Sequence, residues 1–568
     1  MRRVAGGIVH RTPPLPPRRD TWWKEAVFYE VYLRSFFDSD GDGVGDLAGV
    51  TARLEHFVTL GVDAIWITPF FRSPMADFGY DVADYLDVDP LFGTLDDLRF
   101  LIAQAHALGL RVLIDFVPSH TSNRHPWFLE ARESRSGPKA NWYVFADPKP
   151  DGSPPNNWLS VFGGVAWEWE PRRGQYYLHN FLRQQPDLNW HEPAVREALF
   201  EVADFWFSLG VDGLRIDALE FGFHDPGLRS NPPAGTGDPP FGAGTPWAMQ
   251  RHRWNSERPE LTELFLKPLW RRSEERWGGR VLLGEVTGDR QLLRMAGHTA
   301  GGGLDLAYSF ALCRGPLTAR RVREAVETVE RHLGRGWVMW AFSNHDVVRA
   351  VSRLGVADPP ERARAMLPVL LASLRGSPCL YQGEELGLEE AALAFEDLRD
   401  PFGIAMWPRH PGRDGCRTPY PWSAAAPHGG FSAAEPWLRF FEPHRARALD
   451  RQQGRAGSVF ERLRAFLAFR RRRRALRLGR IRFLDVPEPL LLFLREEGAE
   501  RLVCAFNAGP QPAVLEDPWE GARAAFSDGE SEVHAGRLRL ASWGYLFLEL
   551  PASGTSSPLA SKSRRTVA

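Results

Sequence analysis

The sequence contains few cysteines, no long hydrophobic run and almost no excess of charge of one sign. Its 568 residues include only four cysteines, which are far apart and form no C-x-x-C pair. Four cysteines are too few for a disulfide scaffold and are typical of a reducing compartment. The nearest candidate for a membrane span, Met366–Leu374, is far shorter than the roughly 20 residues that cross a bilayer. The net charge is −1, so no global field favours nucleic acid or an anionic membrane.

Both ends of the chain have compositions that disfavour a packed structure. The first 20 residues are basic and rich in proline, without the roughly 7–15-residue apolar core that a secretory signal requires. We therefore expect a flexible extension over residues 1–20 and a cytoplasmic protein. Residues 552–568 are rich in serine and basic residues, and we expect them to be disordered. The arginine run Arg470–Arg474 lies inside a helical pattern, so we interpret it as a solvated helix face rather than a nucleic-acid patch.

Short apolar segments alternate with longer amphipathic segments through most of the chain. Segments such as Leu95–Leu108 and Glu192–Leu209 have the spacing of amphipathic helices. Eight apolar segments are predicted to be buried strands: Ala26–Leu33, Asp63–Pro69, Arg111–Val117, Asp212–Ala218, Arg280–Val286, Leu304–Phe310, Trp337–Ser343 and Ser377–Gly383. Eight alternating strand and helix units predict an α/β fold, a closed (β/α)₈ TIM barrel. We assign the barrel to residues 21–118 and 190–475.

Two further units are expected outside the barrel. Residues 119–189, between the third strand and the third helix, are too many for a simple loop and should form an excursion domain over the carboxyl-terminal rim. From about Ile481 the sequence changes to short alternating strands. We therefore expect a separate antiparallel β-sandwich domain over residues 476–551.

Charged side chains occur where several of the expected strands end. In an α/β barrel the chemistry lies at the carboxyl ends of the strands, and charges within apolar strands are costly unless they are paired. The titratable residues at these ends are Asp115, Arg215, Asp217, Glu285, His345 and Asp346. Carboxylates from several different strands that converge on one rim are hard to explain by structure alone, so we expect an active site there.

The spacing of these residues predicts how charge is divided between two of the carboxyl groups. Arg215 and Asp217 are two residues apart on one strand, so their side chains point the same way and the guanidinium should keep Asp217 ionised. Asp346 brings another negative charge towards Glu285, which favours a protonated acid. One ionised and one protonated carboxyl group, roughly 5–5.5 Å apart, form the arrangement of a retaining glycosidase.

These motifs resemble those of glycoside hydrolase family 13, the α-amylase family, and within it the α-glucosidase and oligo-1,6-glucosidase group. The stretches similar to the family's motifs are DFVPSH (115–120), GLRIDAL (213–219), GEV (284–286), FSNHD (342–346), DFGYDVADY (77–85) and SPCLYQGEELG (377–387). The resemblance covers nearly the whole chain, from about Trp22 to Leu550. It implies that Asp217 is the nucleophile, that Glu285 is the general acid/base, and that Asp346 is the third carboxylate, which binds sugar hydroxyls.

The resemblance also assigns residues that bind the substrate. His120 and His345 are similar to the histidines that donate to hydroxyls of the sugar in the first subsite. Asp77 and Tyr80, together with Arg417 in GRDGCRTP, resemble the residues that close the pocket behind a terminal glucose. Such a closed pocket implies cleavage from the chain end, although Asp77 and Arg417 could instead form only a structural ion pair.

Two single positions refine this comparison. Ala218 follows the nucleophile, where the related enzymes tend to carry valine when they act on α-1,6 bonds and alanine or threonine when they act on α-1,4 bonds. Alanine therefore favours α-1,4 activity. Ser119 stands where many members carry asparagine, so the support of His120 and Asp115 is expected to differ.

The loop after the first expected strand has the ligand spacing of the front of an EF-hand. Side-chain oxygens at Asp38, Asp40, Asp42 and Asp46, and a backbone carbonyl at Val44, occupy the required positions, with glycine at the sixth. The closing glutamate is absent. A solvated acidic turn is the alternative, but these aspartates would repel one another without a cation. In the α-glucosidase relatives the same loop binds calcium or magnesium, so we expect a structural Ca²⁺ or Mg²⁺ and no organic cofactor.

The leading hypothesis is a retaining, exo-acting α-glucosidase that releases glucose from the non-reducing end of small α-glucosides. The close alternative is a transglucosidase or isomerase, such as a trehalose- or sucrose-acting relative, which passes the glucosyl group to a sugar instead of water. A more remote alternative is a non-catalytic amylase-like binding module. Such chains have lost the catalytic carboxylates and carry a membrane span, and neither feature is expected here. No nucleic-acid or membrane partner is expected, and the sequence leaves the oligomeric state open.

Overall fold

The computed structural model describes residues 21–235, 245–256, 258–287, 291–301, 303–516, 519, 521–534 and 536–551. The expectations for residues 1–20 and 552–568 lie outside these described residues. No helix in the described part of the chain is long and apolar enough to cross a membrane.

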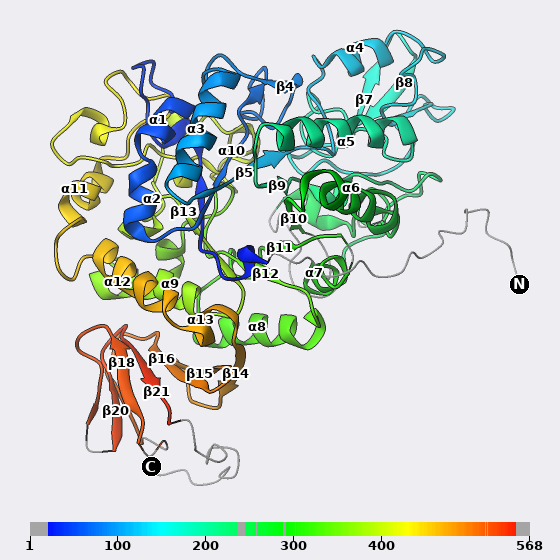
Figure 1. The fold of residues 1–568 in the computed structure, drawn as a ribbon. Helices are drawn as coiled ribbons and strands as arrows, with labels where there is room; N and C mark the ends of the chain where they lie inside the picture. The colour runs from blue at the N-terminus through cyan, green and yellow to red at the C-terminus, as the bar shows by residue number, and fades with distance from the viewer. Residues whose placement is uncertain are drawn as a thin grey trace, which may run out of the picture.

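Eight parallel strands form a closed barrel (Figure 1), which confirms the predicted TIM barrel. The barrel strands are β1 (Phe28–Val31), β2 (Ala64–Ile67), β5 (Arg111–Phe116), β9 (Gly213–Ile216), β10 (Val281–Val286), β11 (Leu306–Ser309), β12 (Val338–Trp340) and β13 (Ser377–Tyr381). Each of these strands lies within one of the eight predicted segments. Each pairs with the preceding and following strands of the barrel, and β1 pairs with β13 to close it. Most strands are shorter than predicted, several of them at both ends; Asp115 and Glu285 lie within β5 and β10, whereas Asp217 and Asp346 follow β9 and β12.

An outer layer of helices covers the barrel, as the amphipathic spacing predicted. The helices that follow the eight strands are α2 (Leu54–Leu60), α3 (Leu95–Ala107), α5 (Pro193–Ser208), α6 (Lys267–Trp277), α7 (Gln291–Thr299), α8 (Ala319–Leu333), α9 (Glu361–Ser373) and α12 (Val459–Arg471). Shorter helices are α1 (Leu47–Ala52), α10 (Pro401–Met406), α11 (Leu449–Gln452) and α13 (Arg474–Leu478). Helix α3 begins where it does because Thr94 and Asp97 form a reciprocal capping box.

The segment 119–189 forms a small layer beside the barrel, at the upper right of Figure 1. It contains α4 (Pro126–Ala131), β6 (Phe145–Ala146), β7 (Trp167–Glu170) and β8 (Gln175–Leu178), and the three strands pair antiparallel in the order β6–β8–β7. A two-stranded ribbon, β3 (Phe71–Arg72) and β4 (Asp84–Val88), follows β2. An isolated bridge between His120 and Asp187 closes the base of the segment and holds His120 at the barrel rim.

The carboxyl-terminal region forms the predicted antiparallel β domain, at the lower left of Figure 1. One sheet contains β14 (Arg480–Leu484), β15 (Leu490–Glu497), β16 (Glu500–Asn507), β21 (Tyr545–Glu549) and β18 (Arg523–Ser527). The second sheet contains β17 (Ala513–Glu516), β20 (Arg537–Leu540) and β19 (Glu532–His534). Leu538 and Leu540 of the second sheet pack in one apolar cluster with Leu492, Val503 and Leu548 of the first, so the two sheets form a sandwich.

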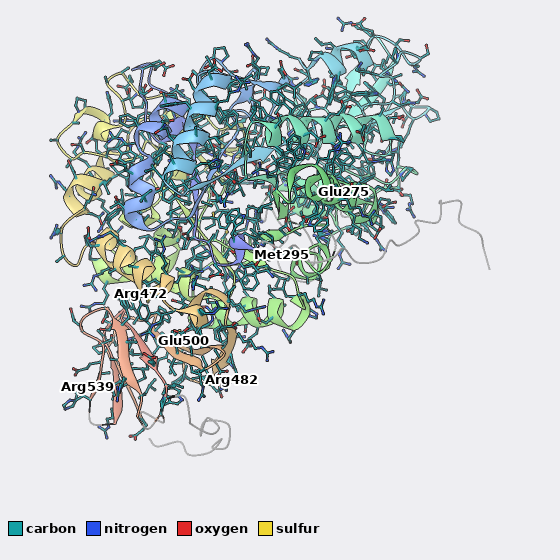
Figure 2. All side chains as sticks on the ribbon, viewed as in Figure 1. Glu275, Met295, Arg472, Arg482, Glu500 and Arg539 are labelled. Carbon is teal, nitrogen blue, oxygen red and sulfur yellow. The ribbon has the colours of Figure 1, made fainter. Side chains whose placement is uncertain are left out.

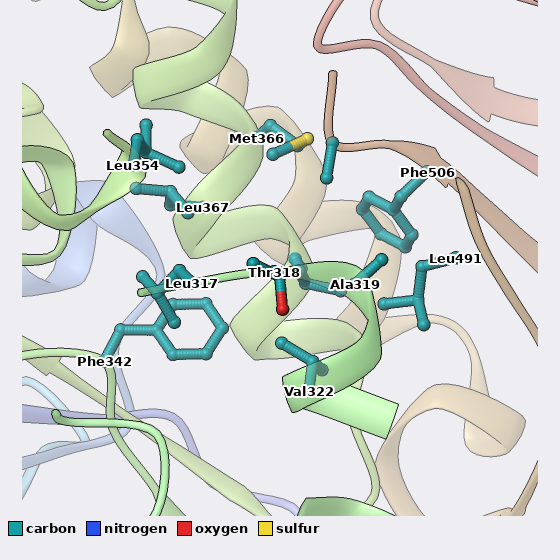
Figure 3. Close-up of a pocket in the computed structure, with 12 residues that line it drawn as sticks. Leu317, Thr318, Ala319, Val322, Phe342, Leu354, Met366, Leu367, Leu491 and Phe506 are labelled. Carbon is teal, nitrogen blue, oxygen red and sulfur yellow. The ribbon is translucent and has the colours of Figure 1, made fainter. Parts of the chain in front are cut away.

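Apolar side chains join this sandwich to the barrel. Figure 3 shows a small gap between α8, α9 and the sandwich, lined by Val322, Met366, Leu491, Phe506 and their neighbours. Its volume is about 10 Å³, enough for one water at most. The gap is therefore a packing defect of the interface and cannot hold a sugar.

Candidate active site

Arg215, in β9, lies at the centre of the site and is fully buried. Its Nη1 donates to Asp115 at 2.7 Å and to Asp217 at 2.5 Å. Its Nη2 donates to Glu285 at 2.7 Å. Since β5, β9 and β10 are neighbours in the barrel, their parallel order brings three carboxylates predicted at strand ends onto one guanidinium.

The structure contradicts the expectation that Arg215 alone keeps Asp217 ionised. Burial raises the pKa of Asp217 well above its ordinary value, Arg215 lowers this pKa, and the charges of Glu285 and Asp115 raise it again. The guanidinium cannot favour Asp217 selectively, because it contacts all three carboxylates. The guanidinium therefore does not by itself hold the pKa of Asp217 low.

A sharp turn after Asp217 brings a backbone donor to the second carboxylate of the pair. Ala218 has a φ of 44°, in the left-handed region, and its N–H donates to Glu285 Oε2 at 3.2 Å. Arg215 donates to the same oxygen, which leaves Oε1 as the atom that can carry the acid proton. Asp217 and Glu285 are each 8% exposed, so both are reachable only from the rim.

Asp346, in the loop after β12, is placed beside two arginines. Its Oδ1 accepts hydrogen bonds from Arg417 at 2.9 Å and from Arg413 at 3.3 Å, and its Oδ2 lies 3.4 Å from His345 Nε2. Burial opposes ionisation of Asp346, but His345, Arg413 and Arg417 together hold its pKa well below the usual range. Asp346 is therefore ionised at neutral pH and can accept hydrogen bonds from sugar hydroxyls.

Asp77 pairs with a different arginine from the predicted one. Its Oδ1 accepts from Arg413 at 2.7 Å and its Oδ2 accepts from Gln185 at 3.2 Å. Arg417 bonds to Asp346 instead. The predicted carboxylate–guanidinium pair is thus Asp77–Arg413, and the prediction of Arg417 as the partner of Asp77 is wrong. Both arginines belong to the motif GRDGCRTP. The motif therefore identified the correct loop, but its spacing did not indicate which of the two arginines pairs with Asp77.

Glu30, in β1, is a site residue that the sequence analysis missed. It is fully buried, and its Oε1 lies 2.5 Å from His345 Nδ1. His345 Nε2 in turn lies 2.7 Å from the hydroxyl of Tyr80, and the two rings are stacked. A carboxylate within the apolar strand FYEV is costly unless it is paired, and that signal could have identified Glu30.

Burial favours the neutral forms of Glu30 and His345. It raises the pKa of Glu30 well above its ordinary value and lowers the pKa of His345 to about 3. A protonated Glu30 donates to Nδ1, so the imidazole proton lies on Nε2. Nε2 faces Tyr80 and Asp346, so His345 presents a hydrogen-bond donor to these two groups.

His120 lies at the base of the excursion segment. Its Nε2 lies 3.1 Å from the carbonyl oxygen of Tyr80 and 3.1 Å from Gln185 Nε2. Burial lowers the pKa of His120 to about 4, so the ring is neutral at neutral pH. Ser119 Oγ lies 2.9 Å from Nδ1, so the serine that replaces the usual asparagine still contacts the ring directly.

The acidic loop at residues 38–46 forms a separate cluster. The carboxylates of Asp38, Asp40 and Asp42 offer oxygens that lie within 4.8 Å of one another. Hard oxygen donors of this kind suit Ca²⁺ or Mg²⁺. Gly43, at the sixth position, has a φ of 93°, and a Cβ there would lie 2.2 Å from the carbonyl oxygen of Glu435. The turn therefore requires glycine, and these three carboxylates fit a divalent cation.

Asp46, also predicted as a ligand, makes hydrogen bonds within the loop. Its Oδ1 accepts from the N–H of Gly49 at 2.6 Å and thereby caps the amino end of α1. Both of its oxygens also accept from Ser39 at 2.7 Å. The carboxylate is occupied in holding the loop together and lies outside the cluster of three.

Comparisons with known proteins identify the family of this chain. The family described as "Alpha amylase, catalytic domain" matches residues 30–479. The chain is 51% identical over 545 residues to a probable α-glucosidase of Rhizobium meliloti (strain 1021), covering 94% of this chain and 98% of the relative. It is 32% identical over 544 residues to an oligo-1,6-glucosidase of Heyndrickxia coagulans, covering 88% of this chain and 94% of the relative.

Two solved structures are similar over nearly the whole chain. An α-glucosyl transfer enzyme, XgtA, has a TM-score of 0.91 at 50% identity, with 94% of this chain and 100% of that chain covered. An isomaltulose synthase mutant from Erwinia rhapontici NX5, solved with its natural substrate sucrose, has a TM-score of 0.85 at 30% identity, with 94% and 100% covered.

Proposed function

Because the chain belongs to the α-amylase family of glycoside hydrolases, we propose that it is a retaining, exo-acting α-glucosidase. The observation that carries this proposal is that one guanidinium, Arg215, contacts both Asp217 and Glu285. An inverting enzyme holds its two carboxyl groups roughly 6.5–9.5 Å apart to admit a water, whereas a retaining enzyme holds them roughly 5–5.5 Å apart. Two carboxylates on one guanidinium favour the shorter separation.

In the proposed reaction, the two carboxyl groups exchange roles between two steps. Glu285 protonates the glycosidic oxygen while an oxygen of Asp217 attacks the anomeric carbon, so the carbon–oxygen bond to the leaving sugar breaks as the ester bond to Asp217 forms. Glu285, now ionised, then removes a proton from water, which displaces Asp217 and releases α-glucose. Arg215 stabilises the negative charge on whichever carboxylate is ionised, and Asp346 binds hydroxyls of the same sugar.

The exo specificity is proposed from the ion pair behind the first sugar. Arg413 donates to Asp77 at 2.7 Å and is itself fixed by Asp400 at 2.7 Å. A buried pair of this kind closes the pocket and offers both donors and acceptors to the hydroxyls of a terminal glucose. A substrate that continued past this sugar would have to displace the pair, so cleavage is expected at the non-reducing end.

The transglucosidase or isomerase hypothesis remains the second candidate, because similar solved structures are an α-glucosyl transfer enzyme and an isomaltulose synthase. Both alternatives use the same covalent intermediate and differ in the acceptor. Product analysis of the purified protein with maltose, isomaltose, sucrose and trehalose separates them. Free glucose as the main product from dilute maltose supports the hydrolase. Oligosaccharides or an isomeric disaccharide as the main product would replace it with the second candidate.

The residue after the nucleophile provides a test of linkage preference. Ala218 packs with Val161, Phe221 and Trp247 beside the catalytic pair. We expect Ala218→Val, which adds two carbons to the pocket wall, to shift the ratio of isomaltose to maltose hydrolysis towards isomaltose by at least about tenfold. Ala218→Thr is the matched control, because both residues are β-branched and share the strain of a φ of 44°. An equal shift in both variants, or none in either, would contradict the linkage proposal.

Glu30 is proposed to position His345 through its ring nitrogen. We expect Glu30→Leu to lower kcat/KM on maltose by about 10–100-fold, because Nδ1 loses its partner and the proton on Nε2 is no longer fixed. Glu30→Gln retains a hydrogen bond to Nδ1 and should stay within about threefold of the wild-type enzyme. Thermal unfolding of both variants separates a positioning effect from instability. Equal losses of activity at equal Tm would contradict this role.

We propose that Asp38, Asp40 and Asp42 hold a structural Ca²⁺ or Mg²⁺, with Val44 supplying a carbonyl. The loop is tied to a distant segment, because Asp38 accepts from Ser432 Oγ at 2.5 Å and Gly43 accepts from the N–H of Trp437 at 2.8 Å. A cation bound only to the folded chain raises stability by mass action. Chelation should therefore lower Tm by a few degrees, and added Ca²⁺ or Mg²⁺ should restore it. In Asp40→Asn the response should disappear, and an unchanged response would contradict the site.

A cytoplasmic location is proposed on the chemistry of the thiols. All four cysteines are buried and free of disulfides. Free thiols support a reducing compartment.

A further inference from the structure

A second polar cavity lies at the opposite end of the barrel from the catalytic carboxylates. Its volume is about 300 Å³, and its walls are the segments before β1, β2 and β5 together with the ends of α12 and α13. These segments lead into the amino ends of three adjacent strands, whereas Asp217 and Glu285 lie at the carboxyl ends. Sites for small molecules have volumes of about 300–1,000 Å³, so the cavity is large enough for a compact ligand.

The charge of this cavity differs from that of the whole chain. Its ionisable lining residues are Arg111, Arg470, Arg471, Arg477, Glu25 and Asp63. The lining thus carries two more positive than negative groups, in a chain whose net charge is −1. Arg111 pairs with Asp212 behind the lining, Arg471 pairs with Asp63 and Arg477 pairs with Glu25, so Arg470 is the lining arginine without a carboxylate partner among the described residues. We call this site the arginine cavity.

Arg470 contradicts the prediction of a solvated helix face, since only 2% of it is exposed. Its Nε donates to the carbonyl oxygen of Ala372 at 3.1 Å and its Nη1 donates to that of Glu25 at 2.8 Å. Its Nη2 is buried and has no hydrogen-bond partner among the described residues. Burial lowers the pKa of Arg470 to about 10, so it stays charged at neutral pH. A buried charged donor without a partner is costly, and an anion in the cavity would satisfy it.

The other arginines are held at the wall of the cavity by carboxylates, and Arg111 Nη1 donates to Asp212 at 3.0 Å. Arg477 bonds to the Glu25 carboxylate, while its Nε is also buried without a partner in the described structure. Arg471 Nη2 lies 3.0 Å from Asp63 Oδ1, and Arg471 is largely exposed. Guanidinium groups match phosphate oxygens with two parallel hydrogen bonds, so a cluster of them favours phosphate over a small halide.

We propose that the arginine cavity binds a phosphate group, either as inorganic phosphate or as part of a small phosphorylated sugar. Arg470 and Arg477 contact the phosphate from the inner wall, and Arg471 closes the outer side. Figure 2 labels the adjacent Arg472 where α12 ends, between the barrel and the β-sandwich. A ligand there would connect the start of β1 to α12 and α13 and would be separate from the sugar substrate.

The experiment is isothermal titration calorimetry of the full chain with sodium phosphate, at constant ionic strength set with chloride, and then with glucose 6-phosphate. Saturable binding of phosphate is expected, and excess glucose should not displace it. Tighter binding of glucose 6-phosphate would identify a phosphorylated sugar as the ligand, and equal binding would identify free phosphate. Absence of saturable binding to both would overturn the proposal.

Variants assign the binding to the arginine cavity. Arg471→Gln combined with Arg477→Gln should weaken phosphate binding at least about tenfold, since two charged hydrogen bonds are lost. Glu25→Gln removes a repelling charge and should strengthen binding. Arg474→Gln is the control, because Arg474 follows the same helix end but lies outside the cavity and is exposed. Unchanged binding in the double variant, or an equal loss in the control, would place the phosphate elsewhere and refute the site.

Discussion

The Asp217→Asn variant is expected to lose hydrolysis of maltose by about four orders of magnitude or more, because the amide cannot form the ester with the anomeric carbon. The loss should be as large with p-nitrophenyl α-glucoside, since a better leaving group does not replace the nucleophile. Steady-state rates on both substrates measure the effect. A rate within tenfold of the wild-type enzyme would refute the assignment of Asp217.

The same variant should fold at least as stably as the wild-type protein at neutral pH. Burial and the charges of Glu285 and Asp115 raise the pKa of Asp217 in the folded state. Because the pKa of Asp217 is higher in the folded state than in the unfolded state, the contribution of this carboxyl group to the free energy of unfolding is complete below the unfolded pKa of about 3.9. This contribution is lost as the pH rises through the folded-state pKa. Asparagine does not ionise and therefore avoids this loss. The Tm of Asp217→Asn should exceed the wild-type Tm at pH 7 and approach the wild-type Tm near pH 4. A lower Tm at pH 7 would indicate that the carboxylate has a structural role.

The Glu285→Gln variant is expected to lose activity according to the leaving group. On maltose, kcat/KM should fall by about 10²–10⁴-fold, because the leaving sugar needs a proton that glutamine does not supply. On p-nitrophenyl α-glucoside the loss of kcat/KM should be much smaller, because the nitrophenolate leaves without a proton. Glutamine keeps the size of the side chain, and its carbonyl oxygen can take the place of Glu285 Oε2 and accept from the N–H of Ala218, so the fold should be preserved.

External azide provides the control for the second half of the reaction. Azide needs no general base, so it should restore turnover of the activated substrate in Glu285→Gln and form α-glucosyl azide. Azide should not rescue Asp217→Asn in the same way, because no glucosyl ester accumulates there. Equal losses on both substrates without azide rescue would contradict the acid/base role of Glu285.

The sequence predicted the barrel well, because a parallel strand buried on both faces must be almost entirely apolar. Segments such as RVLIDFV and RVLLGEV have that composition and carry one acidic residue near the carboxyl end. A charge at such a position must enter the rim, so the strand order alone brought Asp115, Asp217 and Glu285 together. The pattern of apolar segments therefore predicted both the fold and the approximate place of the candidate site.

The sequence did not predict which partner each charged group takes. Whether Arg413 or Arg417 reaches Asp77 depends on the path of an irregular loop, and the two are separated by only four residues. The sharing of Arg215 among three carboxylates depends on neighbouring strands, whereas the prediction considered only residues of one strand. Arg470 was misassigned for a related reason, since helical spacing does not show that α9 and the segment before β1 cover its face.

The central claim is that Asp217 and Glu285 act as nucleophile and acid/base on the same sugar, with net retention at the anomeric carbon. Proton NMR of the glucose released from p-nitrophenyl α-glucoside tests this claim most directly, if spectra are recorded before mutarotation, because all of that glucose comes from the reacting sugar. The account predicts that α-glucose appears first and β-glucose follows only at the rate of mutarotation. Initial release of β-glucose would show a single displacement by water and would contradict the account.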